Sequence, residues 1–398
     1  MRALDPSLRR VYVALLLWGV GFGLYNYLWP NFATGLGANG VELGLLFAVT
    51  TLVNTVVALP GGWLADRFDR RRVILIGWWI AVPSAILWAL AGSWQALIPG
   101  ILLYNGSNVL VPSLQSYVAS RAPAERVAST FTLVFSASSL GPVLSPAIGG
   151  YIAQRLGIRM LFWLAFALFA ASAVALHGIE GTTAARRAPG PRRSGLGDLL
   201  GAGRQVWILS ALAAVVIGID TLAWPFFPTF LKQRGGAGDV AIGWYGALVS
   251  LSAAVAVALS GRLGERFGAS RTLAWAQGIL ASATALIAGA PGQPAAVASA
   301  MVLRGSLDGS RTLMTAQVSG TVAPERIGRA FGVYNLVIGM AGAATPYVGG
   351  WLYQRSPAWP FWASVPLMAL VAVLVPLGLR RGRQPRVKVP RPVGVVQG

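Results

Sequence analysis

The chain has 398 residues, of which 55% are hydrophobic and only 11% are charged. Soluble domains carry about a quarter charged residues, so this composition is typical of a chain whose solvent is largely lipid. The sequence has no cysteine and one histidine, which excludes disulfides, thiolate metal sites and histidine clusters. No metal and no cofactor is therefore expected.

Apolar runs long enough to cross about 30 Å of hydrocarbon as helices occur throughout the chain. Twelve spans are predicted, at 9–30, 41–64, 73–91, 95–119, 128–153, 159–178, 205–231, 239–262, 271–290, 295–319, 328–354 and 359–379. Asp5 and Pro6 are expected to cap the first helix and to occupy its first turn. The sequence thus predicts an all-α integral membrane protein with twelve transmembrane helices.

The formal net charge of +20 comes from basic residues in short gaps between the apolar runs, which argues against a nucleic-acid partner. With the N-terminus inside, 25 of the 32 Lys and Arg residues lie in inner segments, five in outer segments and two within 295–319. This asymmetry predicts a multi-pass protein of the cell inner (plasma) membrane with both termini cytoplasmic. Anionic lipids are the expected partners of the basic loops and tail, at about 1 kcal/mol per basic residue.

The segment 61–72 reads GGWLADRFDRRR and joins two predicted spans. It resembles the signature loop of the major facilitator superfamily, which reads G-x-L-A-D-R-x-G-R-R/K. The matching residues are Gly62, Leu64, Ala65, Asp66, Arg67, Arg70 and Arg71, and Asp69 stands in place of the second glycine. A degraded copy at 261–271 contains Glu265 and Arg266.

The resemblance implies a conformational gate at these two loops. Asp66 lies at the C-terminal end of a helix, where the helix dipole disfavours a carboxylate, so it needs a positive partner. In the family this partner lies at the start of helix 11, here near Gly328 and Arg329. By symmetry, Glu265 would meet the start of helix 5. The contact would close the cytoplasmic face in the outward-open state; a purely topological role for the loop arginines is the alternative.

An internal repeat divides the chain into two halves. Eight residues recur as identities 200 positions later: Glu125, Arg126, Phe131, Pro146, Gly149, Gly150, Gln154 and Arg155. We therefore expect two pseudosymmetric six-helix halves, 1–180 and 205–380, related by a parallel repeat. The segment 181–204 is rich in Gly, Pro and Arg and is expected to be a flexible cytoplasmic linker, and 381–398 a basic cytoplasmic tail.

The fifth predicted helix carries the sequence SPAIGG, with Pro146, Gly149 and Gly150. It resembles the G-P-x-x-G-G signature associated with antiporters of the superfamily. The eleventh helix repeats it with Pro346, Gly349 and Gly350, and a motif present in both halves favours close helix packing and kinking over antiport itself. Many proton antiporters of the family also carry an Arg in helix 4, and none occurs here between Trp94 and Ser120.

The tenth predicted helix carries Arg304, Asp308 and Arg311 at spacing i, i+4 and i+7, which places them on one face. A charge near the bilayer midplane costs about 2.5–3.5 kcal/mol, so these groups must find partners in the bundle interior. The seventh helix contributes Asp220. Because helices 1, 4, 7 and 10 line the central cavity in the family, the resemblance places all four charges around one cavity. The alternative is that they only neutralise one another, with Arg304 and Asp308 pairing within one turn.

Polar and aromatic residues on the other cavity helices suit a small-molecule site. These candidates for substrate binding are Tyr25 and Asn26 on helix 1, Asn105, Asn108 and Gln115 on helix 4, and Trp224 one turn beyond Asp220. Asn108 aligns with Asp308 at the offset of 200, so the first half offers neutral groups where the second carries charge.

These features indicate a secondary active transporter that works by alternating access rather than an enzyme. The sequence contains no Walker loop and no nucleophile elbow, so the energy must come from a gradient. The expected activity is proton-coupled efflux of an amphipathic compound by a monomer, with Asp308 as the titrating group and Asp220 as the alternative. Uptake or exchange of a small polar or anionic metabolite, and an uncoupled membrane receptor or lipid-handling protein on the same scaffold, remain the other functions to test.

Overall fold

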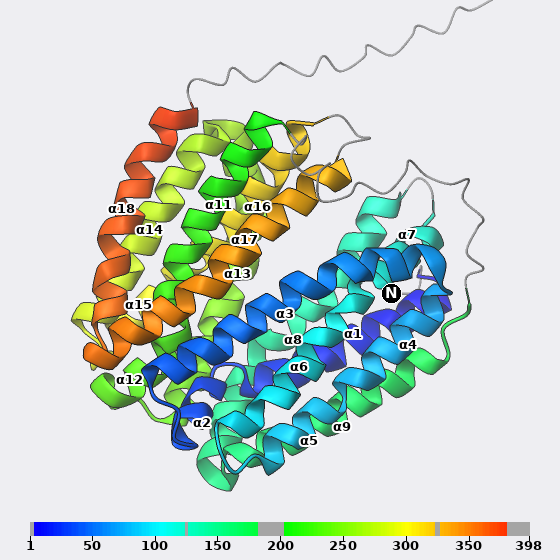
Figure 1. Cartoon of the computed structure of the whole chain (residues 1–398), viewed down its shortest axis with the longest axis horizontal. Helices are drawn as coiled ribbons and strands as arrows, with labels where there is room; N and C mark the ends of the chain where they lie inside the picture. The colour runs from blue at the N-terminus through cyan, green and yellow to red at the C-terminus, as the bar shows by residue number, and fades with distance from the viewer. Residues whose placement is uncertain (1–3, 124–125, 182–202, 323–326, 380–398) are drawn as a thin grey trace, which may run out of the picture.

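The computed structural model describes residues 4–123, 126–181, 203–322 and 327–379, and this part of the chain contains helices and no strand (Figure 1). The first half comprises α1 (Pro6–Tyr25), α2 (Trp29–Gly35), α3 (Gly40–Arg67), α4 (Arg70–Ala81), α5 (Pro83–Leu90), η1 (Gln95–Leu97), α6 (Ile98–Gly106), η2 (Ser107–Leu110), α7 (Val111–Arg121), α8 (Val127–Leu156) and α9 (Ile158–His177). The second half comprises α11 (Arg204–Ala223), η5 (Trp224–Phe226), α12 (Phe227–Gly235), α13 (Asp239–Phe267), α14 (Ala269–Gly289), α15 (Pro294–Arg304), α16 (Ser306–Gly320), α17 (Ile327–Arg355) and α18 (Trp359–Leu379). The all-α prediction is confirmed, whereas the predicted linker and tail lie almost wholly outside the described residues.

Ten helical segments of the described residues are long and apolar enough to cross a membrane, and they coincide with ten of the twelve predicted spans. The other two predicted spans fall on α15–α16 and on α17. The helices α15 and α16 have 11 and 15 residues, so neither is long enough alone. Helix α17 has 29 residues, but Tyr334, Asn335 and Pro346 lower its hydropathy.

The start of α1 follows the predicted cap. The Asp5 carboxylate accepts a hydrogen bond from the backbone N–H of Ser7 at 3.1 Å, and Pro6 occupies the first turn. Pro6 has no N–H to leave unpaired at this position, and the Asp5 side chain satisfies one of the free donors of the helix end. The predicted cap is therefore confirmed.

Four of the predicted spans, 9–30, 95–119, 205–231 and 295–319, fall on helices that are interrupted, although the segments Gln95–Arg121 and Arg204–Gly235 are each long and apolar enough to cross a membrane. The first predicted helix is split into α1 and α2, and the seventh into α11, η5 and α12. The fourth is split into α6, η2 and α7, and the tenth into α15 and α16. In the first three, a proline begins the following helix, where its missing N–H is tolerated: Pro30, Pro112 and Pro228. In the tenth, the break is at Gly305, which lies so close to the Ser252 backbone that a Cβ would clash. The interruptions recur in both halves, as the repeat requires.

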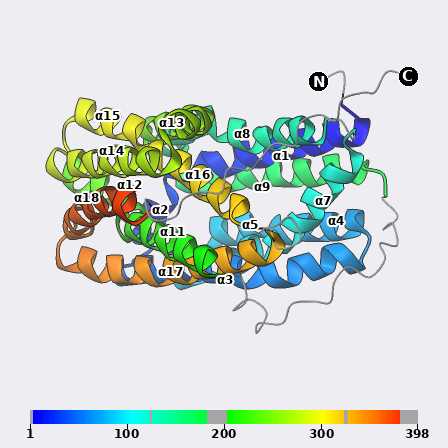
Figure 2. The same cartoon turned by 90° about the horizontal axis from the view of Figure 1, so that it is seen from above.

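The two halves meet along two helix pairs. Helix α3 packs against α17 and α13 packs against α8, and the two pairs lie along opposite edges of the molecule (Figure 2). The backbones approach most closely where Gly350 meets Gly40 and where Gly150 meets Asp239, since a Cβ at either glycine would collide with the partner's carbonyl oxygen. The short helices α2 and α12 also contact each other at this end, and the halves diverge towards the opposite end (Figure 1).

The same glycine motif packs helices within each half. A Cβ at Gly149 on α8 would collide with the carbonyl of Leu24 on α1, and a Cβ at Gly349 on α17 would collide with the carbonyl of Leu222 on α11. Helix α1 therefore packs on α8 as α11 packs on α17. The motif glycines Gly149 and Gly349 thus lie at close helix contacts in both halves.

Candidate functional site

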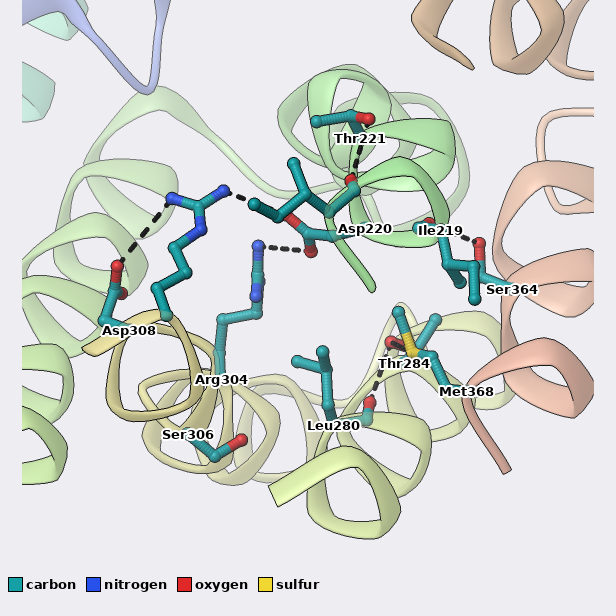
Figure 3. A network of polar contacts seen from close by, with 12 residues as sticks. Ile219, Asp220, Thr221, Leu280, Thr284, Arg304, Ser306, Asp308, Ser364 and Met368 are labelled. Atoms are coloured by element: carbon teal, nitrogen blue, oxygen red, sulfur yellow. Dashed lines mark hydrogen bonds and ion pairs between the residues drawn. The ribbon is translucent and has the colours of Figure 1, made fainter. Parts of the chain in front are cut away.

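Four charged side chains from three helices lie together inside the second half. The carboxylate of Asp220, in the last turn of α11, faces the guanidinium groups of Arg304 at the end of α15 and Arg311 on α16 (Figure 3). Asp308, in the first turn of α16, faces Arg311. The formal charge of this cluster is zero. The sequence-based expectation that these four residues meet is therefore matched by the geometry.

The pair at the centre of the cluster is Asp220 with Arg304. Arg304 Nη2 lies 2.6 Å from Asp220 Oδ1, and the two side chains are 6% and 5% exposed. Such a buried pair costs desolvation energy, and it is strongly destabilising to break because the remaining charge loses its partner. Arg304 pairs with α11 across the bundle, so among the described ion pairs it does not use Asp308, its neighbour one helix turn away.

The second pair is looser. Arg311 Nη1 lies 3.9 Å from Asp308 Oδ1, and Arg311 Nη2 lies 4.0 Å from Asp220 Oδ2. Asp308 and Arg311 are 40% and 42% exposed, in contrast to the buried pair. At these distances neither contact is a good hydrogen bond, since charged N–H···O bonds are usually about 2.7–2.9 Å long. Asp308 is thus the carboxylate of the cluster that stays open to water and to ligands.

An aromatic wall adjoins the charges. The Arg304 guanidinium lies 4.1 Å from the ring centroid of Trp224, within cation–π range. Trp224 stacks on Phe227 at 4.7 Å, and its ring meets the edge of Tyr27 at 6.4 Å. Tyr27 belongs to the first half, and its ring reaches the second half at Trp224. The break between α1 and α2 carries Tyr27 across to the second half, and sequence reasoning missed this residue.

The asparagines of the fourth helix form a separate polar group in the first half. Asn54 Nδ2 on α3 donates to Asn105 Oδ1 at 2.9 Å, and Asn108 Nδ2 donates to Asn54 Oδ1 at 2.6 Å. Asn105 also donates to the Ile101 carbonyl at 2.9 Å. These bonds tie α3 to α6 and η2. Asn54 was not predicted as a partner, because a single asparagine in a long apolar helix gives no sign of which neighbour it faces.

The remaining cavity candidates lie in different surroundings. Tyr25 is 3% exposed and packs among aromatic rings of the first half, including Trp88 at 5.5 Å and Phe162 at 5.4 Å. Asn26 ends α1, where its backbone N–H donates to the Phe22 carbonyl. Gln115 is exposed on α7. The structure thus groups Trp224 with the charges and places Tyr25 in the core.

The signature loop is short and capped. Helix α3 ends at Arg67, so Asp66 lies in its last turn as predicted, but its side chain lies outside the described part of the structure, as does that of Arg329. Asp69 accepts a hydrogen bond from the backbone N–H of Arg71 at 3.2 Å and caps α4. This cap gives a physical role to the aspartate that replaces the second glycine.

The arginines of this loop have local contacts. Arg71 Nη2 donates to the carbonyl of His177 at 2.9 Å, at the C-terminal end of α9, where a positive charge is favourable. Arg67 lies 5.4 Å from the ring centroid of Trp63. Gly62 has open space around it, and Arg70 is half-buried.

In the second copy of the loop, Glu265 and Arg266 are exposed, and the Arg266 guanidinium lies 5.1 Å from the ring centroid of Phe267. The acidic residue of this copy thus stands near the end of α13, as Asp66 stands at the end of α3.

Comparison with known proteins shows which family this chain resembles. The family model described as Major Facilitator Superfamily matches residues 11–219 and 206–395. The quinolone resistance protein NorA of Staphylococcus aureus (strain MRSA252) is 28% identical over 178 residues, which are 44% of this chain and 46% of NorA. The match therefore spans less than half the length of this curated relative.

Solved structures agree over nearly the whole chain. The nucleoside transporter NupG superposes with a TM-score of 0.77 at 13% identity, covering 95% of this chain and 100% of NupG. The human organic anion transporter MFSD10 superposes with a TM-score of 0.68 at 19% identity, covering 93% of this chain and 99% of MFSD10. At these identities the likeness concerns the fold, and the family model covers both halves. The chain is a multi-pass membrane protein that belongs to the Major Facilitator Superfamily.

Proposed function

We propose that the protein is a proton-coupled exporter of an amphipathic compound that works by alternating access of its two halves. Membership of a transporter family rather than an enzyme family supports small-molecule transport. Proton coupling and export of a cation are supported by the unequal pairing within the charged cluster. Asp220 is locked to Arg304, whereas Asp308 is half-exposed and only loosely held by Arg311.

Charge balance links a proton to a cationic substrate at Asp308. With Asp220, Arg304, Asp308 and Arg311 all ionised, the site is neutral. Binding of one proton to Asp308 makes it +1, and binding of one organic cation beside the Asp308 carboxylate also makes it +1. Binding of both would leave +2 in a site where uncompensated charge is costly. Proton and cation therefore exclude each other, and this reciprocal coupling is what antiport requires.

The aromatic rings supply the apolar side of the site. Trp224, Phe227 and Tyr27 form a wall next to the charges, and an amphipathic cation needs both an apolar surface and a carboxylate. The quinolone resistance protein, matched over part of its length, supports efflux as the direction.

A second candidate function rests on Arg311, which is 42% exposed and lies 3.9 Å or more from both carboxylates. Protonation of Asp308 would leave Arg311 with the distant Asp220 alone, so it could bind an anionic group. In that case proton and anion would bind together, and the protein would take up or exchange a small anionic metabolite.

The proposed orientation follows from the charge asymmetry of the loops, with both termini and the 181–204 linker cytoplasmic in the cell membrane. The halves then touch at the outer end, where Gly40 meets Gly350, and diverge towards the cytoplasm. The family's gate at Asp66 and Glu265 would form in the opposite conformation.

The test is transport by the purified full chain in proteoliposomes with an acidic lumen. A quaternary ammonium amphiphile is the probe, because a weak base would accumulate in an acidic lumen without any protein. Gradient-dependent accumulation of this cation, abolished by a protonophore, is the expected result. Its neutral isostere should not accumulate.

Accumulation of an organic sulfonate, which stays ionised and does not partition as a weak acid, in vesicles with an alkaline lumen would overturn the export proposal in favour of anion–proton symport. Uptake of the cation that ignores the gradient would also contradict proton coupling and would favour an uncoupled receptor or facilitator.

A further inference from the structure

An apolar groove lies on the outer surface of the second half, away from the charged cluster. It has a volume of about 430 Å³ and is bounded by α13, α14 and the α15–α16 break. This size falls within the usual range of about 300–1,000 Å³ for small-ligand pockets. Its side chains include Leu251, Val255 and Trp275, which are 49–52% exposed on the protein surface.

The groove has almost no polar lining. The hydroxyl groups that border it are already bonded within the protein: Ser252 donates to the Met301 carbonyl at 3.0 Å, and Ser310 donates to the Ser306 carbonyl at 3.0 Å. An occupant can therefore make only apolar contacts inside it. Such a surface suits a hydrocarbon chain.

One bulky residue of the first half is replaced by a small one beside the groove. At the offset of 200, Leu110 in the first half corresponds to Ser310. Leu110 is buried against α4, where a Cβ at Gly77 would meet its side chain at 2.7 Å. In the first half the chain's own leucine fills the space, whereas in the second half the smaller Ser310 leaves it open.

One end of the groove carries a basic rim, formed by Arg262, Arg266 and Arg271, all exposed. Arg262 and Arg266 follow the lining residues Leu259 and Leu263 by three positions each, so they lie on the same face of α13, one turn farther on. By the same reasoning Arg271 precedes Trp275 on α14 by one turn.

Direct contacts connect the rim to the groove. The Arg266 guanidinium lies over the Phe267 ring, and Phe267 packs on Trp275 with ring centroids 5.1 Å apart. Glu265 is the one acidic residue between 261 and 271, so this end keeps a net positive charge.

We propose that the groove is a binding site for one anionic phospholipid, with an acyl chain between α13, α14 and α16 and the phosphate on Arg262, Arg266 and Arg271. An apolar slot that ends at a cluster of three arginines complements this ligand in both charge and polarity. The site is separate from the transport cluster, and it fills with lipid a space that the first half fills with its own side chain.

The experiment uses the purified full chain with phosphatidylglycerol that bears a photoreactive diazirine on one acyl chain, and phosphatidylcholine with the same chain. After photolysis, crosslinked peptides are mapped by mass spectrometry. Phosphatidylglycerol should label the groove face of α13 and α14. The double substitution Arg266→Gln with Arg271→Gln should reduce this labelling affinity about thirty-fold, most of the way to the level of phosphatidylcholine, since each basic residue contributes about 1 kcal/mol and Arg262 remains.

Two substitutions fill the groove from different helices. Ser310→Leu installs the residue of the first half, and Ala256→Trp fills the groove from α13; both should abolish crosslinking to this face by either lipid. Val257→Trp is the matched control, because Val257 is 41% exposed on α13 but does not border the groove. If Ser310→Leu does not fold, Ala256→Trp decides the question. Equal labelling by the two lipids in the unaltered protein, or labelling that survives groove filling, would overturn the proposal.

Discussion

Arg304 and Asp220 form a 2.6 Å ion pair between α15 and α11, and both side chains are almost fully buried. The pair joins the two helices whose interruptions, at Gly305 and after Ala223, shape the site. Removal of either residue would leave the other charge buried without a partner, so this contact is expected to stabilise the fold as well as to set the charge of the site.

Replacement of Asp220 by Ala should therefore lower the free energy of unfolding by about 3–5 kcal/mol, since it leaves the Arg304 guanidinium buried without a partner. Denaturant unfolding in detergent measures the loss. Asp239→Ala is the matched control, because Asp239 pairs with Lys232 at 3.2 Å where the two side chains are 22% and 52% exposed, and its loss should cost about 0–1 kcal/mol. Replacement of both buried partners by apolar residues should restore most of the stability. Equal losses at Asp220 and Asp239 would show that the buried pair has no special role.

Trp224 should stabilise Arg304 through its ring face. Trp224→Leu is expected to lower the free energy of unfolding by about 0.5–2 kcal/mol, whereas Trp224→Tyr should retain part of the interaction. Trp351→Leu offers the comparison, since its ring lies under the guanidinium of Arg355 at an exposed site and should matter less. If Leu and Tyr at position 224 give the same stability, the ring does not interact with the charge.

The asparagine group of the first half should act in stability and not in substrate choice. Asn54→Leu removes the partner of both Asn105 and Asn108, so it should cost about 1–3 kcal/mol of unfolding free energy while the profile of transported compounds stays the same. Gln115→Ala, at an exposed site, should change neither property. A changed compound profile at unchanged stability would instead assign Asn105 and Asn108 to the substrate.

The gate hypothesis predicts that Asp66→Asn shifts the protein towards the inward-open state and slows turnover without unfolding it. The sequence has no cysteine, so spin labels at Ser120→Cys and Ser319→Cys report the distance between the ends of α7 and α16 without a background. The mean distance should increase in Asp66→Asn. Asp69→Asn is the control, because it weakens the α4 cap and should not move the halves. Identical distances and identical transport in Asp66→Asn would make Asp66 an ordinary loop residue.

The positions of the helices could be predicted from long apolar runs. Spacing placed Arg304, Asp308 and Arg311 on one helix face, but only the family resemblance brought Asp220 to them. The pairing within the cluster could not be predicted. Spacing alone allows Arg304 to bond Asp308, but the structure pairs it with Asp220 on another helix.

The helix breaks were also hidden. Pro30, Pro112 and Pro228 lie inside apolar runs that read as continuous spans, and membrane helices often tolerate proline. Consequently Tyr27, which reaches Trp224 from the break between α1 and α2, could not be assigned to the site. The groove beside Ser310 depends on a serine in place of the leucine of the first half. This difference shows in the sequence only when the two halves are compared.

The proposed exchange of a proton for the transported compound at Asp308 is tested by Asp308→Asn in proteoliposomes with an imposed pH gradient. Asp220→Asn serves as the comparison within the cluster, and Asp239→Asn as the control outside it. Asp308→Asn should lose gradient-driven accumulation but still exchange labelled for unlabelled compound at equilibrium, while Asp239→Asn should behave as the unaltered protein. If Asp308→Asn and Asp220→Asn both still accumulate the compound in response to the gradient, the charged cluster only holds the helices together and the proposed coupling is wrong.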